Sequence, residues 1–391
     1  MRYDQAFFDA GIDRAGTNSV KWAAWGIMQE GMVPLWVADM DFACAEPISR
    51  ALKERAGHAC YGYTFAGEED AEAFTAFWQR RHRLALHPES LLMLPTVVAG
   101  LRACVQAMTQ PGDGVIIQTP VYGPFIDAVR DSGRVLLDAA LRNDGAGRYT
   151  MDFDAVERFL KGGARLMILC NPHNPVARAW TQEELRTLLM LLNRYKARLV
   201  SDEIHADFVY APRTFIPILS LPEARADTVM LAAASKTFNI AGLQQATAVC
   251  RDRDVKAMLA RYLDRAGAQC GNIFALVGTR AAYTQCDDWL DGLMQYLQGN
   301  RDTLAELVGQ VLPHAVISPM EATYLAWVDI RAYEAPHCEM GARCRKHGVA
   351  LTDGQFFGMS AGEGFMRINY GCPKGQLLDG VQRFAHAVKE G

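Results

Sequence analysis

The sequence has 391 residues, of which 50% are hydrophobic and 21% charged, and this composition excludes collagen-like, disordered and coiled-coil proteins. The 40 Lys and Arg against 44 Asp and Glu give a net charge of −4, with no basic block. Nucleic acid is therefore not an expected partner, because binding it requires clustered cations. A chain of this length exceeds a single hydrophobic core, so we expect two domains.

The beginning of the chain and its cysteines point to a cytoplasmic protein. Residues 1–4 (MRYD) carry no apolar signal core, and no apolar run is long enough to cross a bilayer, so no membrane contact is expected. The ten cysteines are scattered and include no Cys-x-x-Cys pair. We expect them to be reduced and mostly buried, and we expect no metal site.

From about residue 96 to residue 234, short apolar runs alternate with amphipathic stretches. The expected helices cover 96–108, 122–132 and a stretch after the capping box at 181–184. The expected strands cover 115–118, 135–137, 166–170, 199–201 and 229–234. Short, wholly apolar strands separated by helices predict an α/β fold with a mainly parallel sheet covered by helices on both faces.

The remaining chain has a looser pattern, which predicts a smaller α+β domain. Amphipathic helices are expected around 289–311, and a strand-like piece at 324–330. The first 45 residues are rich in Trp and Gly and have few regular periods. We expect a large domain of residues 46–284 and a second unit formed by residues 1–45 and 285–391.

Polar or aromatic side chains follow four of the expected strands, at the edge where open α/β sheets bind ligands. They are Tyr122, the segment 171–175, the segment 202–205 and the segment 235–237. Each has an ordinary structural explanation when taken alone, such as a turn, a helix start or a surface lysine. Together they supply an aromatic face, an amide, a carboxylate with an imidazole, and an amine with a hydroxyl. This set suits pyridoxal 5′-phosphate (PLP), which has a flat ring, a basic nitrogen and an aldehyde.

Nine motifs spread over nearly the whole chain resemble one known family. They are 16–22 (GTNSVKW), 35–42 (LWVADMDF), 61–64 (YGYT), 111–113 (PGD), 118–122 (QTPVY), 170–175 (CNPHNP), 201–207 (SDEIHAD), 235–243 (SKTFNIAGL) and 367–369 (RIN). The chain resembles the fold-type I PLP enzymes, which share the class I/II aminotransferase fold. Within them it is most similar to the carbon–sulfur β-lyases of the MalY/PatB type, which include cystathionine β-lyase.

The resemblance implies a role for each residue that follows the strands. Lys236 would be the Schiff-base lysine and the base that removes the substrate Cα proton. Asp202 would hold a proton on the pyridine nitrogen, Asn174 would bind the ring hydroxyl, and Tyr122 would stack on the ring face. His205 would stand beside the cofactor, at a position where many aminotransferases of this fold have tyrosine.

The resemblance also implies how the cofactor phosphate is bound. Val98 and Ala99 would offer backbone N–H groups at a helix N-terminus, and Ser235 would add a hydroxyl. Tyr63 would reach the phosphate of a neighbouring subunit, so a homodimer with composite active sites is expected.

The substrate is expected to be an amino acid, with its carboxylate bound by Arg367 and with Ala38 and Asn174 beside it. The chain departs from the family pattern at two glycine positions, where it has Ala177 and Ala322. Alanine tolerates positive φ less well than glycine, so we expect reshaped loops near the pocket entrance. Gln244 stands where related aminotransferases often have a phosphate-binding arginine, and this difference favours a lyase.

The leading prediction is an enzyme that cleaves L-cystathionine or a related S-substituted L-cysteine to a thiol, pyruvate and ammonia. The alternative is a class I/II aminotransferase, which shares every step up to the loss of the Cα proton. A further alternative is a regulatory protein that retains lyase activity and acts through a surface patch. A catalytically inactive scaffold is disfavoured because every catalytic position is filled.

Overall fold

The computed structural model describes residues 3–14, 16–28, 30–268, 271–334 and 339–390. Its largest sheet has seven strands in the order β2-β10-β9-β8-β7-β3-β4. Their bounds are β2 Leu91–Leu94, β3 Gly114–Ile117, β4 Val135–Asp138, β7 Leu166–Cys170, β8 Arg198–Asp202, β9 Val229–Ala232 and β10 Ala246–Cys250. The strands from β9 to β4 are mutually parallel, whereas β10 runs antiparallel to β9 and β2. The predicted mainly parallel sheet is confirmed, and β2 and β10 extend it beyond the expected strands.

Both faces of this sheet are buried, and alternate residues of one strand enter different cores. In β7, Leu166 and Ile168 pack in one core, while Met167 and Leu169 pack in the other. A strand covered on both faces has no polar side, which is why its sequence reads as a continuous apolar run. The first core contains residues of α5 (Val97–Met108), α6 (Gly123–Arg130) and α10 (Arg253–Arg265). The second contains residues of α7 (Phe153–Lys161) and α8 (Gln182–Arg194).

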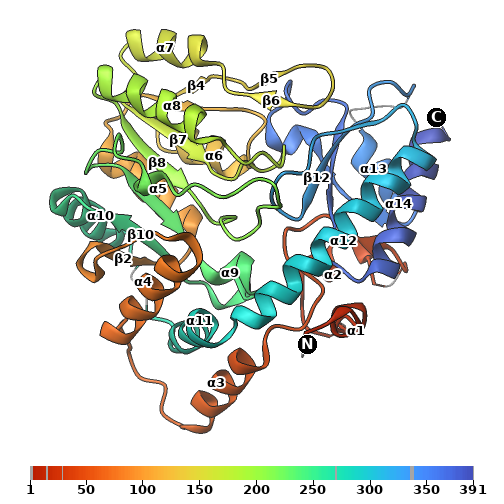
Figure 1. Cartoon of the computed structure of the whole chain (residues 1–391), viewed down its shortest axis with the longest axis horizontal. Coiled ribbons are helices and arrows are strands. Elements are labelled where there is room, and N and C mark those ends of the chain that lie inside the picture. The colour runs from red at the N-terminus through yellow and green to blue at the C-terminus, as the bar shows by residue number, and fades with distance from the viewer. Residues whose placement is uncertain (1–2, 15, 29, 269–270, 335–338, 391) are drawn as a thin grey trace.

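The helix ends follow the sequence signals. Thr181 and Glu184 form the predicted capping box of α8, in which each side chain accepts from the backbone N–H of the other residue. The remaining helices of the first 285 residues are α1 (Gln5–Asp9), α2 (Val20–Ala23), α3 (Glu46–Gly57), α4 (Glu68–His82), α9 (Ala234–Thr237) and α11 (Ile273–Gln285). α11 packs against α3 and α4 (Figure 1).

A second, four-stranded antiparallel sheet lies in the C-terminal part, in the order β11-β12-β15-β14. Its strands are β11 Val316–Ile317, β12 Leu325–Asp329, β14 Thr352–Asp353 and β15 Phe365–Asn369. The long helix α12 (Asp287–Val311) packs against α14 (Lys374–Lys389), which also contacts α13 (Met340–Lys346) (Figure 1). Strands β5 (Arg142–Asn143) and β6 (Tyr149–Thr150) form a short antiparallel hairpin.

The N-terminal segment joins this C-terminal part. Strand β1 (Val33–Pro34) pairs in parallel with β13 (Val349–Ala350). Two backbone N–H···O bonds flank the pair, from Val33 to Gly348 and from Leu35 to Ala350. The division of the chain into residues 46–284 and the two flanking segments stays a prediction.

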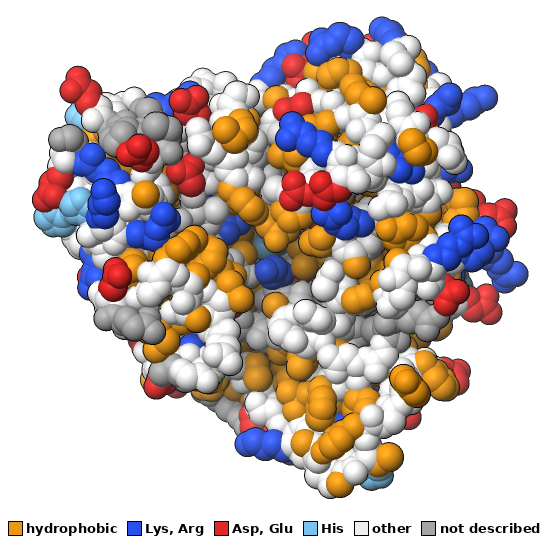
Figure 2. All heavy atoms as spheres, turned by 180° about the vertical axis from the view of Figure 1, so that it is seen from behind, with side chains coloured by type: hydrophobic (Ala, Val, Ile, Leu, Met, Phe, Trp, Pro, Cys, Tyr) orange, Lys and Arg blue, Asp and Glu red, His pale blue; other side chains and the backbone are white. Residues whose placement is uncertain are grey.

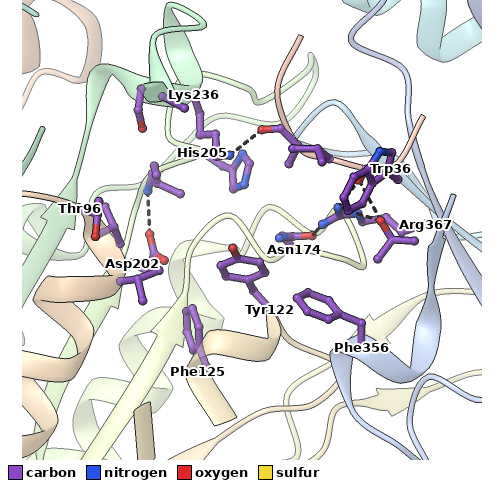
Figure 3. A pocket seen from close by; sticks show the side chains of 18 of the residues that line it. Trp36, Thr96, Tyr122, Phe125, Asn174, Asp202, His205, Lys236, Phe356 and Arg367 are labelled. Atoms are coloured by element: carbon purple, nitrogen blue, oxygen red, sulfur yellow. Dashed lines mark hydrogen bonds between the residues drawn. The ribbon is translucent and has the colours of Figure 1, made fainter. Parts of the chain in front are cut away.

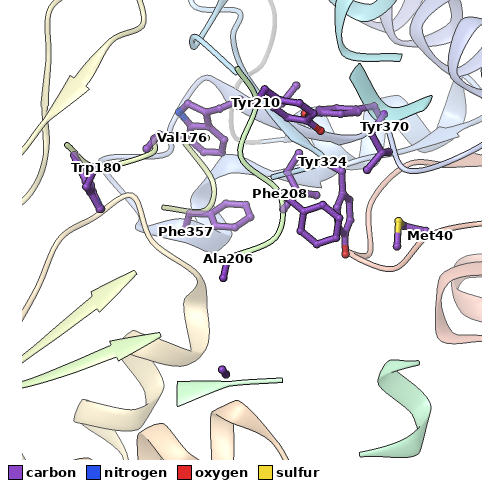
Figure 4. Packing of buried hydrophobic residues seen from close by; sticks show 14 of the residues in the cluster. Met40, Val176, Trp180, Ala206, Phe208, Tyr210, Tyr324, Phe357 and Tyr370 are labelled. Carbon is purple, nitrogen blue, oxygen red and sulfur yellow. The ribbon is translucent and has the colours of Figure 1, made fainter. Parts of the chain in front are cut away.

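A buried aromatic cluster links the segment after β8 with the smaller sheet (Figure 4). The rings of Phe208 and Tyr324 meet edge to face, with centroids 4.8 Å apart. The hydroxyls of Tyr210 and Tyr370 both donate to the Thr323 carbonyl, at 2.9 and 2.8 Å. This cluster packs the segment after β8 against the residues that flank strands β12 and β15 of the smaller sheet.

No helix among the described residues has the length and apolar character needed to cross a membrane. The eight described cysteines are free thiols, and six of them are buried.

Candidate active site

A cavity of about 520 Å³ lies where the larger sheet faces the smaller one. Its wall contains residues that follow β3, β7, β8 and β9 on one side, and residues of β14 and β15 on the other. Figure 2 shows a hollow near the middle of one face, ringed by hydrophobic side chains and with basic atoms inside it. The predicted site residues Tyr122, Asn174, Asp202, His205, Ser235, Lys236, Arg367, Ala38 and Val98 all line this one cavity.

Lys236 lies in the short helix α9, directly after strand β9. Its Nζ donates to the carbonyl oxygen of Ala38 at 2.6 Å (Figure 3). Burial lowers the pKa of this amine to about 8, partly opposed by the negative charges of Asp39 and Asp202. An amine with this pKa is neutral in a substantial fraction of molecules near neutral pH, as attack on an aldehyde requires.

Asp202 is the last residue of β8, and its Oδ1 accepts from the backbone N–H of Ile204 at 3.1 Å. Burial raises its pKa to about 7, against the lowering effects of that bond and of Lys236. A cationic partner in the cavity would restore the ionised form. The neighbouring Glu203 belongs to the structure around the site instead, because its Oε1 accepts from Ser201, Asn171 and Ile218.

His205 is buried at the cavity wall and is neutral. Burial lowers the pKa of its imidazole to about 3, and the charges of Lys236 and Arg367 add to the effect. Its Nδ1 has no hydrogen-bond partner among the described residues. A buried polar atom without a partner costs free energy, so a polar ligand in the cavity is the partner that this nitrogen fits.

Arg367 lies on β15, across the cavity from Lys236 and with Asn174 next to it (Figure 3). Its guanidinium donates to the Trp36 carbonyl at 2.7 Å, to Thr352 Oγ1 at 3.2 Å and to Asn174 Oδ1 at 3.2 Å. These partners are all neutral, and Nε has none among the described residues. Burial lowers the pKa to about 10, which leaves the group charged at neutral pH. A buried cation with neutral partners is a site for a carboxylate.

Helix α5 presents its N-terminus to the cavity. Thr96 is the N-cap, and its Oγ1 accepts from the Ala99 N–H at 3.1 Å. Thr96 and Val98 line the cavity, whereas Ala99 does not. Ser235 lines the same cavity. A helix N-terminus next to a hydroxyl is a common arrangement for binding phosphate, so these residues fit that group, and the individual phosphate contacts stay predictions.

Two predicted site residues, Tyr63 and Ala99, do not line the cavity, and Tyr63 lies in an irregular segment. It belongs to the stretch 59–67, which has no helix or strand, and its side chain is fully exposed. Its contact with a second subunit stays a prediction.

The two alanines at family glycine positions lie in the core, so the expectation of reshaped loops at the pocket entrance is wrong. Ala177 and Ala322 are fully buried and do not line the cavity. Ala177 keeps a left-handed backbone, with φ of 56°. Its carbonyl accepts from the N–H groups of Glu321 and Ala322 at 3.1 and 3.0 Å, and these bonds hold the conformation in place.

Sequence reasoning missed several residues that support the site. The Trp36 carbonyl and Thr352 hold Arg367, and the Tyr324 hydroxyl donates to the Ala38 carbonyl at 2.9 Å, beside Lys236. Trp36 was visible within the motif 35–42, but the motif gives no hint that its backbone is used. Thr352 lies in a segment without any motif, so no sequence signal indicated it.

Comparison with known proteins agrees with this geometry. The family model for aminotransferase class I and II matches residues 31–384. The chain is 40% identical to cystathionine β-lyase PatB of Bacillus subtilis over 97% of this chain and 99% of that protein. It is 31% identical to the protein MalY of Escherichia coli, over 98% of each chain.

Among solved structures, the PLP-bound C–S lyase of Staphylococcus hominis superposes with a TM-score of 0.89 at 32% identity, over 97% of each chain. These relatives match nearly the full length of the chain, and the solved structure with the same fold holds PLP. The chain belongs to the aminotransferase class I and II family of PLP-dependent enzymes and, within it, to the group that includes cystathionine β-lyase PatB and MalY.

Proposed function

We propose that this protein is a PLP-dependent carbon–sulfur β-lyase that cleaves L-cystathionine or a related S-substituted L-cysteine. The observation that carries the proposal is one cavity that holds a buried amine and a buried carboxyl on one side and a buried arginine with neutral partners on the other. The 40% identity to a protein named cystathionine β-lyase supports a lyase over an aminotransferase.

The residues present fit PLP. Lys236 would bind its aldehyde, Asp202 would bind the ring nitrogen, Asn174 and His205 would supply polar contacts, and Tyr122 would cover a ring face. The buried carboxyl and the partnerless His205 nitrogen are the features that such a ring would satisfy. When bound, PLP supplies an electron sink for the charge that develops at the substrate Cα.

The chain's own residues then position the substrate and move its protons. Arg367 binds the substrate carboxylate with its planar fork and so turns the Cα–H bond toward Lys236. The neutral Lys236 amine takes the Cα proton, and its lowered pKa suits a general base near neutral pH. Asp202 keeps a proton on the ring nitrogen through its negative charge.

The overall reaction balances as a β-elimination followed by hydrolysis. The Cβ–S bond breaks with its electron pair going to sulfur, which takes up a proton and leaves as a thiol. Water then converts the remaining three-carbon fragment to pyruvate and ammonium. No oxidant or amino acceptor is consumed.

Two features of the assembly are part of the proposal. The exposed Tyr63 supports a homodimer in which this residue contacts the phosphate in the neighbouring subunit. A cytoplasmic location is also proposed, on the composition of the sequence and its scattered cysteines, of which the eight described are free thiols.

The test is to incubate the purified holoenzyme with L-cystathionine and no 2-oxo acid, and to measure pyruvate and free thiol. A lyase releases both in equal amounts. Product that forms only after a 2-oxo acid is added would overturn the proposal and identify an aminotransferase.

A further inference from the structure

The outer part of the cavity contains a second arginine that the reaction described above does not use. Arg345, on α13, lines the cavity together with Trp25 and Trp36. Its guanidinium carbon lies 4.6 Å from the ring centroid of Trp25, whose ring lies 4.4 Å from that of Trp36. Arg345 is absent from the ion pairs found among the described residues, which in this part of the chain involve Arg331, His347 and Arg383.

This second cation is connected to the first through the residues Trp36 and Trp25. The backbone carbonyl of Trp36 accepts a hydrogen bond from Arg367, and the ring of Trp36 contacts that of Trp25. The guanidinium of Arg345 packs on the ring of Trp25. The cavity thus has one guanidinium at its inner end and another farther out, with an aromatic wall between them.

A carboxylate lies close to the outer arginine. Asp353 directly follows Thr352, which contacts Arg367, and it also lines the cavity. Its oxygens accept from the backbone N–H groups of Gly341 and Gln355, at 3.3 and 3.0 Å. A methyl group built on Gly341 would lie 3.5 Å from Asp353 Oδ2 and 3.7 Å from Arg345 Nη1. The carboxylate and the guanidinium therefore converge over Gly341 without forming an ion pair within 4.0 Å.

We infer that Arg345 and Asp353, with the indoles of Trp25 and Trp36, form a distal subsite for an amino-acid group at the far end of the sulfur substituent. The inference rests on the proposed function and narrows its substrate class to thioethers that join two amino acids. Arg345 binds the distal carboxylate and Asp353 binds the distal ammonium, while the indoles cover the methylene groups between them.

The paired charges are the reason for this choice of substituent. A purely apolar substituent would cover both charged groups without giving either a partner, which costs free energy. A substituent that carries only a carboxylate would satisfy Arg345 and leave Asp353 uncompensated. A zwitterionic end satisfies both groups at once, and a site built to pair polar groups rejects analogues that lack them.

The test compares three substrates on the holoenzyme by pyruvate release. L-Cystathionine carries both distal charges, S-(2-carboxyethyl)-L-cysteine carries the carboxylate alone, and S-ethyl-L-cysteine carries neither. Arg345→Gln should raise KM at least about tenfold for the first two substrates, because a charge-assisted contact is lost, and by less than about twofold for the third. Asp353→Asn should raise KM for cystathionine alone, and kcat should change little in either variant.

Matched variants control for effects on the fold. Lys346→Gln removes an exposed charge next to Arg345 on α13, outside the cavity, and should leave all three substrates unchanged. Arg345→Lys keeps the charge, so it should raise the KM for cystathionine less than Arg345→Gln does. In Asp353→Asn, the side-chain oxygen can still accept a hydrogen bond from the Gln355 N–H, as Asp353 does where it caps the turn Gly354–Phe357.

Three results would overturn this subsite. The first is an equal rise of KM for all three substrates in Arg345→Gln, and the second is an unchanged KM for cystathionine in that variant. The third is a rise of KM in Lys346→Gln as large as that in Arg345→Gln. A wild-type enzyme that releases no pyruvate from any of the three substrates would overturn the proposed function itself, and the subsite with it. The two failures are therefore distinguishable.

Discussion

The two sides of the active-site cavity are built in different ways. The side with Lys236 and Asp202, which we propose faces the cofactor and call the cofactor-facing side, comes from the ends of the adjacent parallel strands β8 and β9. The substrate-facing side, with Arg367, depends on Trp36 and Thr352, which are far apart along the chain. A regular sheet edge places residues by its repeat alone, whereas the second side requires the N-terminal segment with Trp36 to meet the paired strands β14 and β15.

The two sides also differ in how burial acts on their charges. Burial raises the pKa of Asp202 to about 7 and lowers that of Lys236 to about 8, so both groups can change charge near neutral pH. Burial also lowers the pKa of Arg367, but only to about 10, so that group stays charged. The cofactor-facing side is thus suited to moving protons, and the substrate-facing side to holding an anion.

The largest expected effect comes from removing the amine. Lys236→Ala should lower pyruvate release from cystathionine by on the order of 10³-fold or more, because the base for the Cα proton is lost. Lys53→Ala, which removes an exposed lysine, is the matched control and should keep full activity. Retention of more than a tenth of the wild-type kcat by Lys236→Ala would show that another group takes the proton.

Asp202→Asn should lower kcat by about 10²–10³-fold with a smaller change in KM, because an amide cannot hold a proton on the ring nitrogen through negative charge. Steady-state kinetics with cystathionine give both constants. If KM rises and kcat is unchanged, Asp202 contributes to substrate binding instead of acting on the ring nitrogen. The two sides of the cavity would then not differ in function as proposed.

The same substitution should change how stability depends on pH in the cofactor-free protein. Burial raises the pKa of Asp202 to about 7 from its ordinary value of 3.8, so between about pH 4 and 7 the folded state binds a proton that the unfolded chain releases. Wild-type stability contains a term that falls by about 2–4 kcal/mol as pH rises through this window, and Asp202→Asn should lack it. Urea unfolding at pH 4.5 and pH 7.5 measures the difference, and equal pH dependence in the two proteins would contradict the raised pKa.

Arg367→Lys should act mainly on KM. The loss of the planar fork should raise KM for cystathionine by about 10- to 100-fold, with kcat less affected. Because the ammonium retains the charge, a larger loss is expected for Arg367→Gln. An equal fall of kcat and kcat/KM with unchanged KM would instead indicate that the arginine acts only in the transition state.

The smallest effect concerns the loop behind the cavity. Ala177→Gly should raise the free energy of unfolding by about 1 kcal/mol, because glycine adopts the left-handed conformation of this residue without steric cost. Activity should not change, since Ala177 does not line the cavity. Ala179→Gly is the matched control: this buried residue has no positive φ and should be destabilised by the substitution, as measured by urea unfolding.

The fold was largely readable from sequence because its strands are short, apolar and separated by amphipathic helices. β7 was predicted with its observed bounds, and the capping box at Thr181 marked the start of α8. The antiparallel strand β10 was not anticipated, because an apolar run carries no information about strand direction. The expectation that Ala177 and Ala322 lie in reshaped loops at the pocket entrance was wrong, because both residues are buried in the core. A sequence position does not reveal whether a loop lies at a pocket or in a core.

By itself, the sequence determined the α/β class, the family and the residues of the cofactor-facing side, because each of these follows from local patterns or from motifs that survive as contiguous runs. Only the tertiary structure decided that the Trp36 carbonyl and Thr352 hold Arg367, that the Ala38 carbonyl receives Lys236, and that Arg345 and Asp353 converge over Gly341. The bonds to the Trp36 and Ala38 carbonyls join residues 331 and 198 positions apart, and they use backbone groups, which are the same in every sequence.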